Sequence, residues 1–397
     1  MPTSGEVRTD VAIIGGGIIG SAIAYFLARD GRGGTITVIE PDPAYEHAAT
    51  PQGAGGVRQL FSLPENIWMS KYSLGFYQRF AETMALDDTP AEINFRALGY
   101  LFLVGKDGVE QMRANYRLQI AEGVHAELWD RETVSKHFPS LGTADVELAT
   151  YSPDDGWIDP ESALRGFRRK AEHLRVRYLK DRLCALAARG CKLTRGRLES
   201  GRTLRADVYI NAAGAWAGAV AQMAGMALPV MPLCRLQHYW RCQTPIEALP
   251  LVKDESGLFF RPEGQGFVGG RPSFAIEPGF IFDAASGPLH DYFEREVWPW
   301  LAKRVPVFEA VRCERTWAGH YDENLFDGSM IFGRWTGGCE NFYVACGLSG
   351  HGIMHAPAVG LAMAELVLDG RGHSIDVARF GYQRVLDNAP YRERGII

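Results

Sequence analysis

Four residues near the amino terminus have the types and the spacing needed to bind a dinucleotide. Gly15, Gly17 and Gly20 stand in the segment IIGGGIIG, and Glu40 follows 20 positions after the last of them. Gly15 permits a tight turn, Gly17 lets the backbone approach a pyrophosphate, and Gly20 lets a helix lie close to a strand. A carboxylate at Glu40 can accept hydrogen bonds from both ribose hydroxyls and would repel a 2′-phosphate. The pattern therefore disfavours NADP and leaves FAD and NAD.

The elements predicted around this turn can position those residues. Residues 11–14 are an apolar run suited to a buried parallel strand, and residues 18–29 predict a helix with an Ala-rich face. A pyrophosphate would lie at the positive end of that helix dipole. Residues 36–40 predict a second strand that ends on Glu40. Further along, residues 160–174 predict a helix that Asp159 caps.

Two later glycine segments continue the nucleotide-binding pattern. An apolar strand over residues 206–210 runs into NAAGAWAG, where Gly214 offers a second close approach of the backbone at the carboxyl end of a strand. The segment CGLSGHGIMHAP precedes an apolar helix predicted over residues 358–368, and taken alone it is equally compatible with a plain turn and helix cap. No second G-x-G-x-x-G follows a strand, so the sequence offers no separate site for a nicotinamide.

Composition excludes several classes of protein. The chain has 397 residues, of which 46% are apolar, so it can bury a large core and is expected to form two domains. Its net charge is -5 with both signs mixed along the chain, which argues against a nucleic-acid surface. The seven cysteines lack CxxC spacing, and the carboxylates of DDGWIDPE lack metal-ligand spacing. We therefore expect neither a disulfide framework nor a metal site.

The amino terminus and the apolar runs carry an expectation about location. MPTSGEVRTD is short and polar, with no apolar segment before the first strand. No later run reaches the roughly 18 uncharged apolar residues that a membrane-spanning helix needs. We expect a protein of the reducing cytoplasm that is neither secreted nor integral to a membrane.

Taken together, the motifs resemble the D-amino-acid oxidase and sarcosine oxidase family of flavoproteins, which includes bacterial D-amino-acid dehydrogenases. The amino-terminal fingerprint is common to many families, but NAAGAW followed by TWAG and then GLSGHG is specific. The resemblance spans nearly the whole chain, and the residues that carry it are IIGGGIIG, Glu40, QGAGGVRQ, NAAGAWAG, FFRPEGQGFVGG, RTWAGHYD and GLSGHGIMHAP.

The resemblance implies an α/β fold in which a Rossmann-like FAD-binding domain is interleaved with an α+β substrate domain built on a mostly antiparallel sheet. The aromatic alternation in LQHYWRCQ, GLFFRPEG and GFVGGRPS independently indicates strands of such a sheet. The interleaving assigns residues 1–85, 148–225 and 326–397 to the FAD-binding domain and residues 86–147 and 226–325 to the substrate domain.

The same resemblance implies which residues contact FAD. The backbone N–H groups at a helix start suit the negative charge on the pyrimidine end of a reduced flavin. The implied contacts are Gly15, Gly17, Gly20 and Glu40 for the ADP half, Leu183 for the adenine, Ala212, Ala213 and Gly214 for the pyrophosphate side, and Gly350, His351, Gly352 and Ile353 for the ribityl chain and pyrimidine ring.

The resemblance also bears on how FAD is attached. Sarcosine-oxidase-like members attach FAD through a cysteine that would fall near Gly319, whereas the nearest cysteine here, Cys313, lies on a preceding segment. Other members use a histidine shortly before the AGG segment, and His47 lies too far upstream to match it. We therefore expect non-covalent FAD.

Oxidation of an amine beside a carboxylate needs a neutral amine, a Cα–H aimed at flavin N5, and a fixed cation for the carboxylate. A guanidinium can bind both carboxylate oxygens, which makes Arg58 and Arg271 the candidates. His320 and Tyr321 stand where related enzymes place a side chain that contacts the substrate. Because alternation along a strand sends them to opposite faces, we expect only one of the two to reach the substrate.

The favoured function is a dehydrogenase of D-amino acids or N-alkylated amino acids that passes a hydride to flavin N5. In the oxidases, a lysine that promotes the reaction with oxygen would fall near Phe267, and its absence favours a quinone or an electron carrier protein as acceptor. A second lysine, which holds the substrate carboxylate in sarcosine oxidases, would fall at Met354. A peroxide-forming amine oxidase remains the second enzyme candidate.

A non-enzymatic alternative comes from residues 54–67. AGGVRQLFSLPENI resembles a branch of the family associated with respiratory-complex assembly, and opine-oxidase subunits share the pattern. Such a protein could hold FAD and depend on a subunit or a peripheral membrane partner, with no independent turnover.

Overall fold

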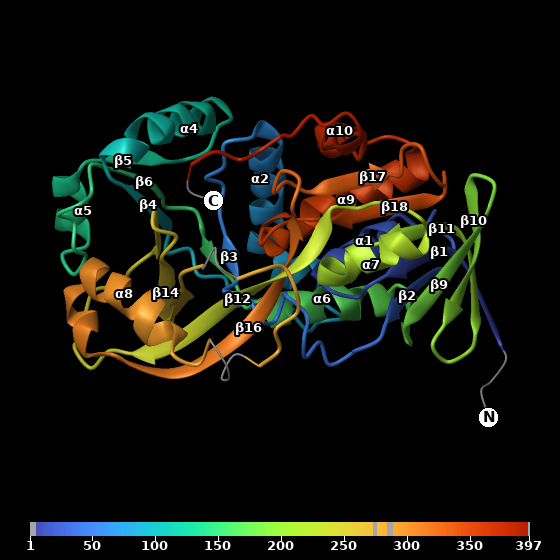
Figure 1. Ribbon diagram of the computed structural model, residues 1–397, viewed down its shortest axis with the longest axis horizontal. Coiled ribbons are helices and arrows are strands. Elements are labelled where there is room, and N and C mark those ends of the chain that lie inside the picture. The colour runs from blue at the N-terminus through green and yellow to red at the C-terminus, as the bar shows by residue number, and fades with distance from the viewer. Residues whose placement is uncertain (1–4, 273–275, 284–288, 396–397) are drawn as a thin grey trace.

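Two large β-sheets organise the chain. The computed structural model describes residues 5–272, 276–283 and 289–395, and Figure 1 shows the two sheets side by side, with the long strands β12 and β16 reaching from one half toward the other. Each sheet has eight strands, and a two-stranded ribbon of β3 (Gly56–Val57) and β7 (Gly156–Trp157) lies apart from them. The predicted fold class, a Rossmann-like sheet combined with a mostly antiparallel sheet, is confirmed.

The first sheet is the Rossmann-like sheet. Its central strands run parallel in the order β18, β11, β1, β2, β8, with β17 antiparallel to β18 at the edge. In β1, residues 11–14 are all buried because both faces of the sheet are covered. The strands are β1 (Glu6–Ile14), β2 (Ile36–Glu40), β8 (Arg177–Lys180), β9 (Leu183–Arg189), β10 (Lys192–Leu198), β11 (Thr203–Asn211), β17 (Ile331–Arg334) and β18 (Phe342–Cys346).

Helices cover this sheet. On one side of the sheet, α1 packs between α9 and α6, and α2 packs against α9. Helix α7 and the β9–β10 hairpin belong to a second, separate hydrophobic core. Helix α6 begins as predicted, because the Asp159 side chain accepts a hydrogen bond from the Ser162 N–H at 2.9 Å. The helices are α1 (Ile18–Asp30), α2 (Pro64–Gln78), α3 (Phe80–Thr83), α6 (Pro160–His173), α7 (Ala217–Met223), α9 (Gly352–Asp369) and α10 (Gln383–Leu386).

Helix α9 begins earlier than predicted. The sequence places its start near residue 358, after Pro357, but the helix starts at Gly352 and continues through the proline. Proline lacks the N–H that would bond the carbonyl four residues earlier. That carbonyl belongs to Ile353, and the hydroxyl of Tyr77 on α2 donates to it at 2.7 Å. A tertiary contact therefore replaces the lost helical bond.

Helix α9 is the apolar segment that bears on the expectation about membrane spans, although it includes Glu365 and Asp369 and so is not an uncharged run. With 18 residues and a mean hydropathy of 1.3, it is long and apolar enough to cross a membrane by length and composition. More than half of it is buried within the protein, and it packs against α1 and α2. Core helices meet the same test of length and composition.

The second sheet carries the order β16, β12, β15, β14, β13, β4, β6, β5, and its pairs are antiparallel except for β13 and β4. Its strands are β4 (Tyr100–Val104), β5 (Glu127–Trp129), β6 (Leu148–Ser152), β12 (Val230–Arg241), β13 (Leu251–Asp254), β14 (Phe259–Glu263), β15 (Gly266–Gly270) and β16 (Arg312–Asn324). Its outer helices are α4 (Val109–Ala121), α5 (Arg131–His137) and α8 (Trp298–Arg304).

The strands of this sheet can be compared with the predicted segments 86–147 and 226–325. All of its strands fall within those segments except β6, which begins at Leu148. Strand β6 pairs with both β4 and β5, so the sheet continues beyond the predicted end of the first segment. The segment 226–325 includes residues 273–275 and 284–288, and the predicted FAD-binding segments include residues 1–4 and 396–397; all of these lie outside the described ranges.

The two faces of β12 have different environments. Cys234, Leu236 and Trp240 pack into the core of the second sheet, together with the ring of His238. Trp240 is fully buried, and its ring stacks on the core residue Phe267. The imidazole Nδ1 of His238 lies 2.9 Å from the Thr316 hydroxyl, and its Nε2 has no hydrogen-bond partner among the described residues.

We expect His238 to make stability depend on pH. Burial lowers its pKa from an ordinary 6.5 to about 4. The unfolded chain then binds the proton more tightly, so stability present above pH 6.5 is lost as the pH falls toward 4. Between pH 6.5 and 5 this loss amounts to about 2 kcal/mol. Urea unfolding at pH 7 and pH 5 should show a smaller loss for His238→Phe than for the native protein, whereas His173→Phe, at an exposed position, should leave the loss unchanged.

Candidate active site

One cavity of about 1140 Å³ lies between the two sheets and is lined by residues of both. At the first sheet it follows the carboxyl ends of β1, β2 and β11, where open α/β sheets bind their ligands. Of the residues predicted to hold the cofactor, those that line it are Gly15, Gly17, Glu40, Leu183, Ala212, Ala213, Gly214, Gly350, His351, Gly352 and Ile353. Of the predicted catalytic residues, Arg58, His320 and Tyr321 line it as well.

The glycines of the first turn have different surroundings. A Cβ added at Gly20 would lie 1.9 Å from the carbonyl oxygen of Gly15, so this glycine lets α1 pack on the turn and does not form a wall of the cavity. A Cβ added at Gly17 would meet no atom within 4 Å. The backbone at Gly17, the N-cap of α1, therefore faces open space, where a pyrophosphate could receive the first N–H groups of the helix.

Glu40 ends β2 at the same edge. One carboxylate oxygen accepts the Gly16 N–H at 2.8 Å, and the other accepts the Asp42 N–H at 2.8 Å. Burial raises the pKa of Glu40, while these two backbone bonds act in the opposite direction. Each carboxylate oxygen has a further lone pair, so the group can still accept ribose hydroxyls.

Arg58 follows β3 and is almost completely buried, with 2% of its surface exposed. Its guanidinium lies over the rings of Phe61 and Phe102, at 4.4 and 5.1 Å from their centroids. Its Nε has no hydrogen-bond partner, and no carboxylate of the described residues lies within 4.0 Å of the group. Burial lowers the pKa of Arg58, yet a guanidinium stays protonated in proteins.

Arg58 also determines the state of His351, the N-cap of α9. The Arg58 Nη2 lies 3.1 Å from the His351 Nε2. Because a guanidinium only donates, this nitrogen accepts, and the imidazole is neutral with its proton on Nδ1. Burial and the positive charge of Arg58 both lower the pKa of His351 well below its ordinary value.

His320 and Tyr321 lie on opposite faces of β16, as alternation predicts. Tyr321 faces the inside of the cavity, with its ring against Gly350 and the Arg235 guanidinium 5.6 Å from the ring centroid. The His320 Nε2 accepts the Ile281 N–H at 2.9 Å, and its ring packs against the partly exposed Phe280 and Phe282. Of the two, Tyr321 is therefore the better candidate for contact with a substrate.

Arg271 does not lie in the cavity lining, contrary to the prediction. It stands just after β15, and its guanidinium packs over Trp300 at 4.6 Å from the ring centroid. Its Nε donates to the Ser256 carbonyl, and its Nη1 lies 3.6 Å from the Glu296 carboxylate. The short strand ends before Arg271, so alternation counted along β15 does not fix the direction of this side chain.

Three polar residues that the sequence analysis did not single out line the cavity from the second sheet. They are Arg235 and Gln237 on β12 and Lys253 on β13. The Gln237 Oε1 is buried without a hydrogen-bond partner among the described residues. The composition of LVKD could have drawn attention to Lys253, because a lysine inside a short apolar strand is unusual and needs a reason.

Other chemistry has little support in the described part of the chain. The seven cysteines are free thiols. Among the described residues, no group of three or more His, Cys, Asp or Glu side chains could hold a metal ion.

The site and the fold together define a class of protein. Glycine turns, an acidic strand end and a buried arginine share one cavity at the switch from a Rossmann-like sheet to an antiparallel one, which is the arrangement of a dinucleotide-dependent oxidoreductase. The model of the DAO family, described as FAD dependent oxidoreductase, matches residues 10–366. The chain belongs to this family, and FAD is its cofactor. The prediction is thereby confirmed at the level of the FAD-dependent oxidoreductase family.

Individual relatives support this assignment. "FAD-dependent oxidoreductase domain-containing protein 1" of Bos taurus is 37% identical, over 95% of this chain and 85% of the relative. Human mitochondrial dimethylglycine dehydrogenase is 26% identical, over 93% of this chain and 43% of its own length. The crystal structure of L-proline dehydrogenase from P. horikoshii superposes with a TM-score of 0.84 at 26% identity, covering 97% of this chain and 100% of that one.

The residues present fit the cofactor. An added Cβ at Gly17, Gly214 or Gly352 would meet no atom within 4 Å, so three separate points of the cavity wall leave the backbone open to a ligand. The start of α1 lies at one of these points and the start of α9 at another. A long anionic dinucleotide can therefore meet backbone N–H groups at both ends.

Proposed function

We propose that this oxidoreductase oxidises the carbon–nitrogen bond of an amino acid, either a D-amino acid or an N-alkylated one. The observation that carries the proposal is Arg58, a buried cation on the cavity with no carboxylate of the described residues within 4.0 Å. A buried charge is costly unless an anion pairs with it. A guanidinium fork matches a carboxylate, so the substrate's own carboxylate is the proposed partner.

The chain would hold FAD along the first sheet. In this proposal Gly15, Gly17 and Glu40 receive the ADP half, with Leu183 at the adenine. Ala212, Ala213 and Gly214 receive the pyrophosphate side, and Gly350, His351, Gly352 and Ile353 receive the ribityl chain and pyrimidine ring. When bound, FAD supplies the two-electron acceptor for the amine.

The protein's own contribution is orientation and exclusion of water. Arg58 fixes the carboxylate, and its bond to His351 fixes Arg58 in turn. Phe102 and Phe259 face the cavity from β4 and β14, and Tyr321 faces it from β16. These rings provide apolar walls for the carbon chain, and fixing one end of the substrate limits the positions that its Cα–H can take.

The electron acceptor remains open between oxygen and a quinone or carrier protein. The missing lysine near Phe267 favoured the second, but the Phe267 side chain packs into the core against Trp240 and Phe308. A lysine at that position would point away from the cavity. The cavity does contain a lysine, Lys253, on another strand. The recovery of the flavin band in air distinguishes the two acceptors.

Anaerobic bleaching of the visible flavin band tests the proposal. The purified protein is mixed with D-amino acids, L-amino acids, N-methyl amino acids and opines, and we expect rapid bleaching by D-amino or N-alkyl amino acids. Readmitting air then distinguishes the acceptors, because fast recovery of the band indicates an oxidase and slow recovery indicates a dehydrogenase. Flavin that dithionite reduces but no amine bleaches would contradict the proposal and favour a role that depends on a partner subunit or in assembly.

A further inference from the structure

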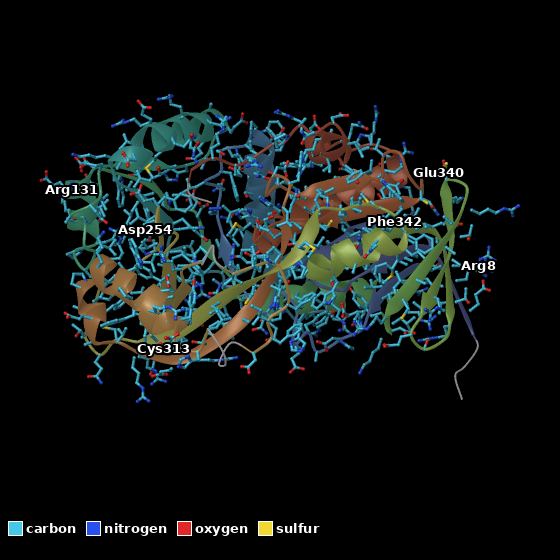
Figure 2. All side chains as sticks on the ribbon, viewed as in Figure 1. Arg8, Arg131, Asp254, Cys313, Glu340 and Phe342 are labelled. Atoms are coloured by element: carbon cyan, nitrogen blue, oxygen red, sulfur yellow. The ribbon has the colours of Figure 1, made fainter. Side chains whose placement is uncertain are left out.

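Lys253 is placed on the cavity by the alternation of β13. Leu251 and Lys253 line the cavity, whereas Val252 packs into the core on the opposite face of the strand. Asp254 also borders the cavity, but its carboxylate pairs with the Arg304 guanidinium, 3.0 Å from its Oδ2, and Figure 2 shows Asp254 inside the half of the molecule that contains the second sheet. The ion pair between Asp254 and Arg304 fixes the register of β13. In that register the Lys253 side chain faces the cavity.

The neighbours of Lys253 bring it close to Arg58. Its cross-strand partners are Phe102 on β4 and Phe259 on β14, so its stem runs between two aromatic side chains. The ring of Phe102 also lies under the Arg58 guanidinium, with 5.1 Å between the ring centroid and Cζ. Lys253 and Arg58 therefore share one aromatic neighbour while they come from different sheets.

The charges around Lys253 favour its neutral form. Burial, and after it the positive charges of Arg58 and Arg235, lower its pKa to about 7, while Asp254 opposes them. The positive charge of Lys253 also lowers the pKa of His351, whose imidazole is itself neutral. A lysine amine that is partly unprotonated near pH 7 can accept a proton.

We propose that Lys253 takes up the proton that the substrate's ammonium group must lose before its carbon–nitrogen bond can be oxidised. An N–H bond of the ammonium breaks and an N–H bond to Nζ forms, so one proton moves and no electrons are lost. The neutral amine then gives up a hydride from Cα in the oxidation proposed above, on which this role depends. A carboxylate bound at Arg58 offsets the positive charge that holds Lys253 neutral, so substrate binding makes the lysine a stronger base.

A binding experiment without turnover tests the proton uptake. Methoxyacetate resembles N-methylglycine but has an ether oxygen in place of the amine, so it cannot supply a proton or be oxidised at nitrogen. Calorimetric titration at pH 7.5 in two buffers of different ionisation enthalpy should show uptake of about half a proton by the native holoprotein. Uptake should disappear in Lys253→Met and persist in Lys192→Met, at an exposed position on β10. No uptake by the native protein, or equal uptake by Lys253→Met, overturns the inference.

The pH profile of anaerobic flavin bleaching at low substrate concentration provides the second test. The rate constant of the native enzyme should level off above about pH 7, whereas that of Lys253→Met should rise up to about pH 10, where the substrate amine loses its own proton. The deficit of the variant should be about 500-fold at pH 7 and should vanish near pH 10. Lys253→Arg keeps the charge but cannot accept a proton, so it should follow Lys253→Met.

The outcomes separate this inference from the proposed function. Identical pH profiles for the native enzyme and Lys253→Met overturn the role of Lys253 while leaving amine oxidation intact. If no amine bleaches the flavin, the proposal of amine oxidation fails. The methoxyacetate titration still decides whether Lys253 takes up a proton when a carboxylate binds.

Discussion

Replacing Arg58 by methionine is expected to lower the rate constant for flavin bleaching at low substrate concentration by about 10³-fold, equivalent to roughly 4 kcal/mol. Methionine fills much of the same space between Phe61 and Phe102 but removes the cation that would bind the substrate carboxylate. It also removes the donor to the His351 Nε2. The loss should appear in both substrate affinity and the limiting rate, because the same contact binds and orients the substrate.

Arg271→Met is the matched control for this experiment. It removes an arginine that also lies over an aromatic ring, Trp300, but outside the cavity lining. We expect it to keep the native bleaching rate within a few-fold. A second variant, Arg58→Lys, keeps the charge but loses the fork, and it should recover only part of the rate. If Arg58→Met binds FAD and bleaches at the native rate, the substrate carboxylate is not bound at Arg58.

Much of the first sheet could be predicted because its signals are local. The glycine turn, the strand ending on Glu40 and the cap at Asp159 each depend on a few adjacent residues, and all three lie where the sequence places them. The start of α9 could not be predicted in the same way. Pro357 indicates a break, and only the hydroxyl of Tyr77, from a distant helix, makes the continuous helix possible.

The substrate side of the cavity was harder to predict for a related reason. The register of the whole sheet decides which face of a strand borders the cavity. The four-residue strand LVKD is too short to show a clear alternation of apolar and polar residues. Lys253 was therefore not identified, and Arg271, a candidate for the carboxylate that stands beyond the end of β15, lies outside the cavity lining. Arg58 could be found because its segment resembles the family directly.

Replacing Gly17 by leucine is expected to weaken FAD binding about 100-fold or more without unfolding the chain. The backbone at Gly17 has φ -61° and ψ -173°, which any residue adopts, and an added Cβ would meet no protein atom within 4 Å. The new side chain would instead occupy the space beside the first N–H groups of α1. Losing one hydrogen bond to a charged group costs about 1.5–3 kcal/mol, so blocking two of them should weaken FAD binding by about 100-fold or more.

Gly75→Leu on α2 is the control for the added side chain, because an added Cβ there also meets no atom within 4 Å but the residue lies away from the cavity. The Gly75→Leu variant should retain FAD and therefore its visible absorbance. Gly20→Ala makes the opposite comparison: its Cβ would lie 1.9 Å from the Gly15 carbonyl, so it should destabilise the fold itself. Visible absorbance per protein and urea unfolding distinguish the two effects. If Gly17→Leu folds and retains FAD, the pyrophosphate does not pass this turn. The assignment of the first sheet to the ADP half of FAD would then be wrong.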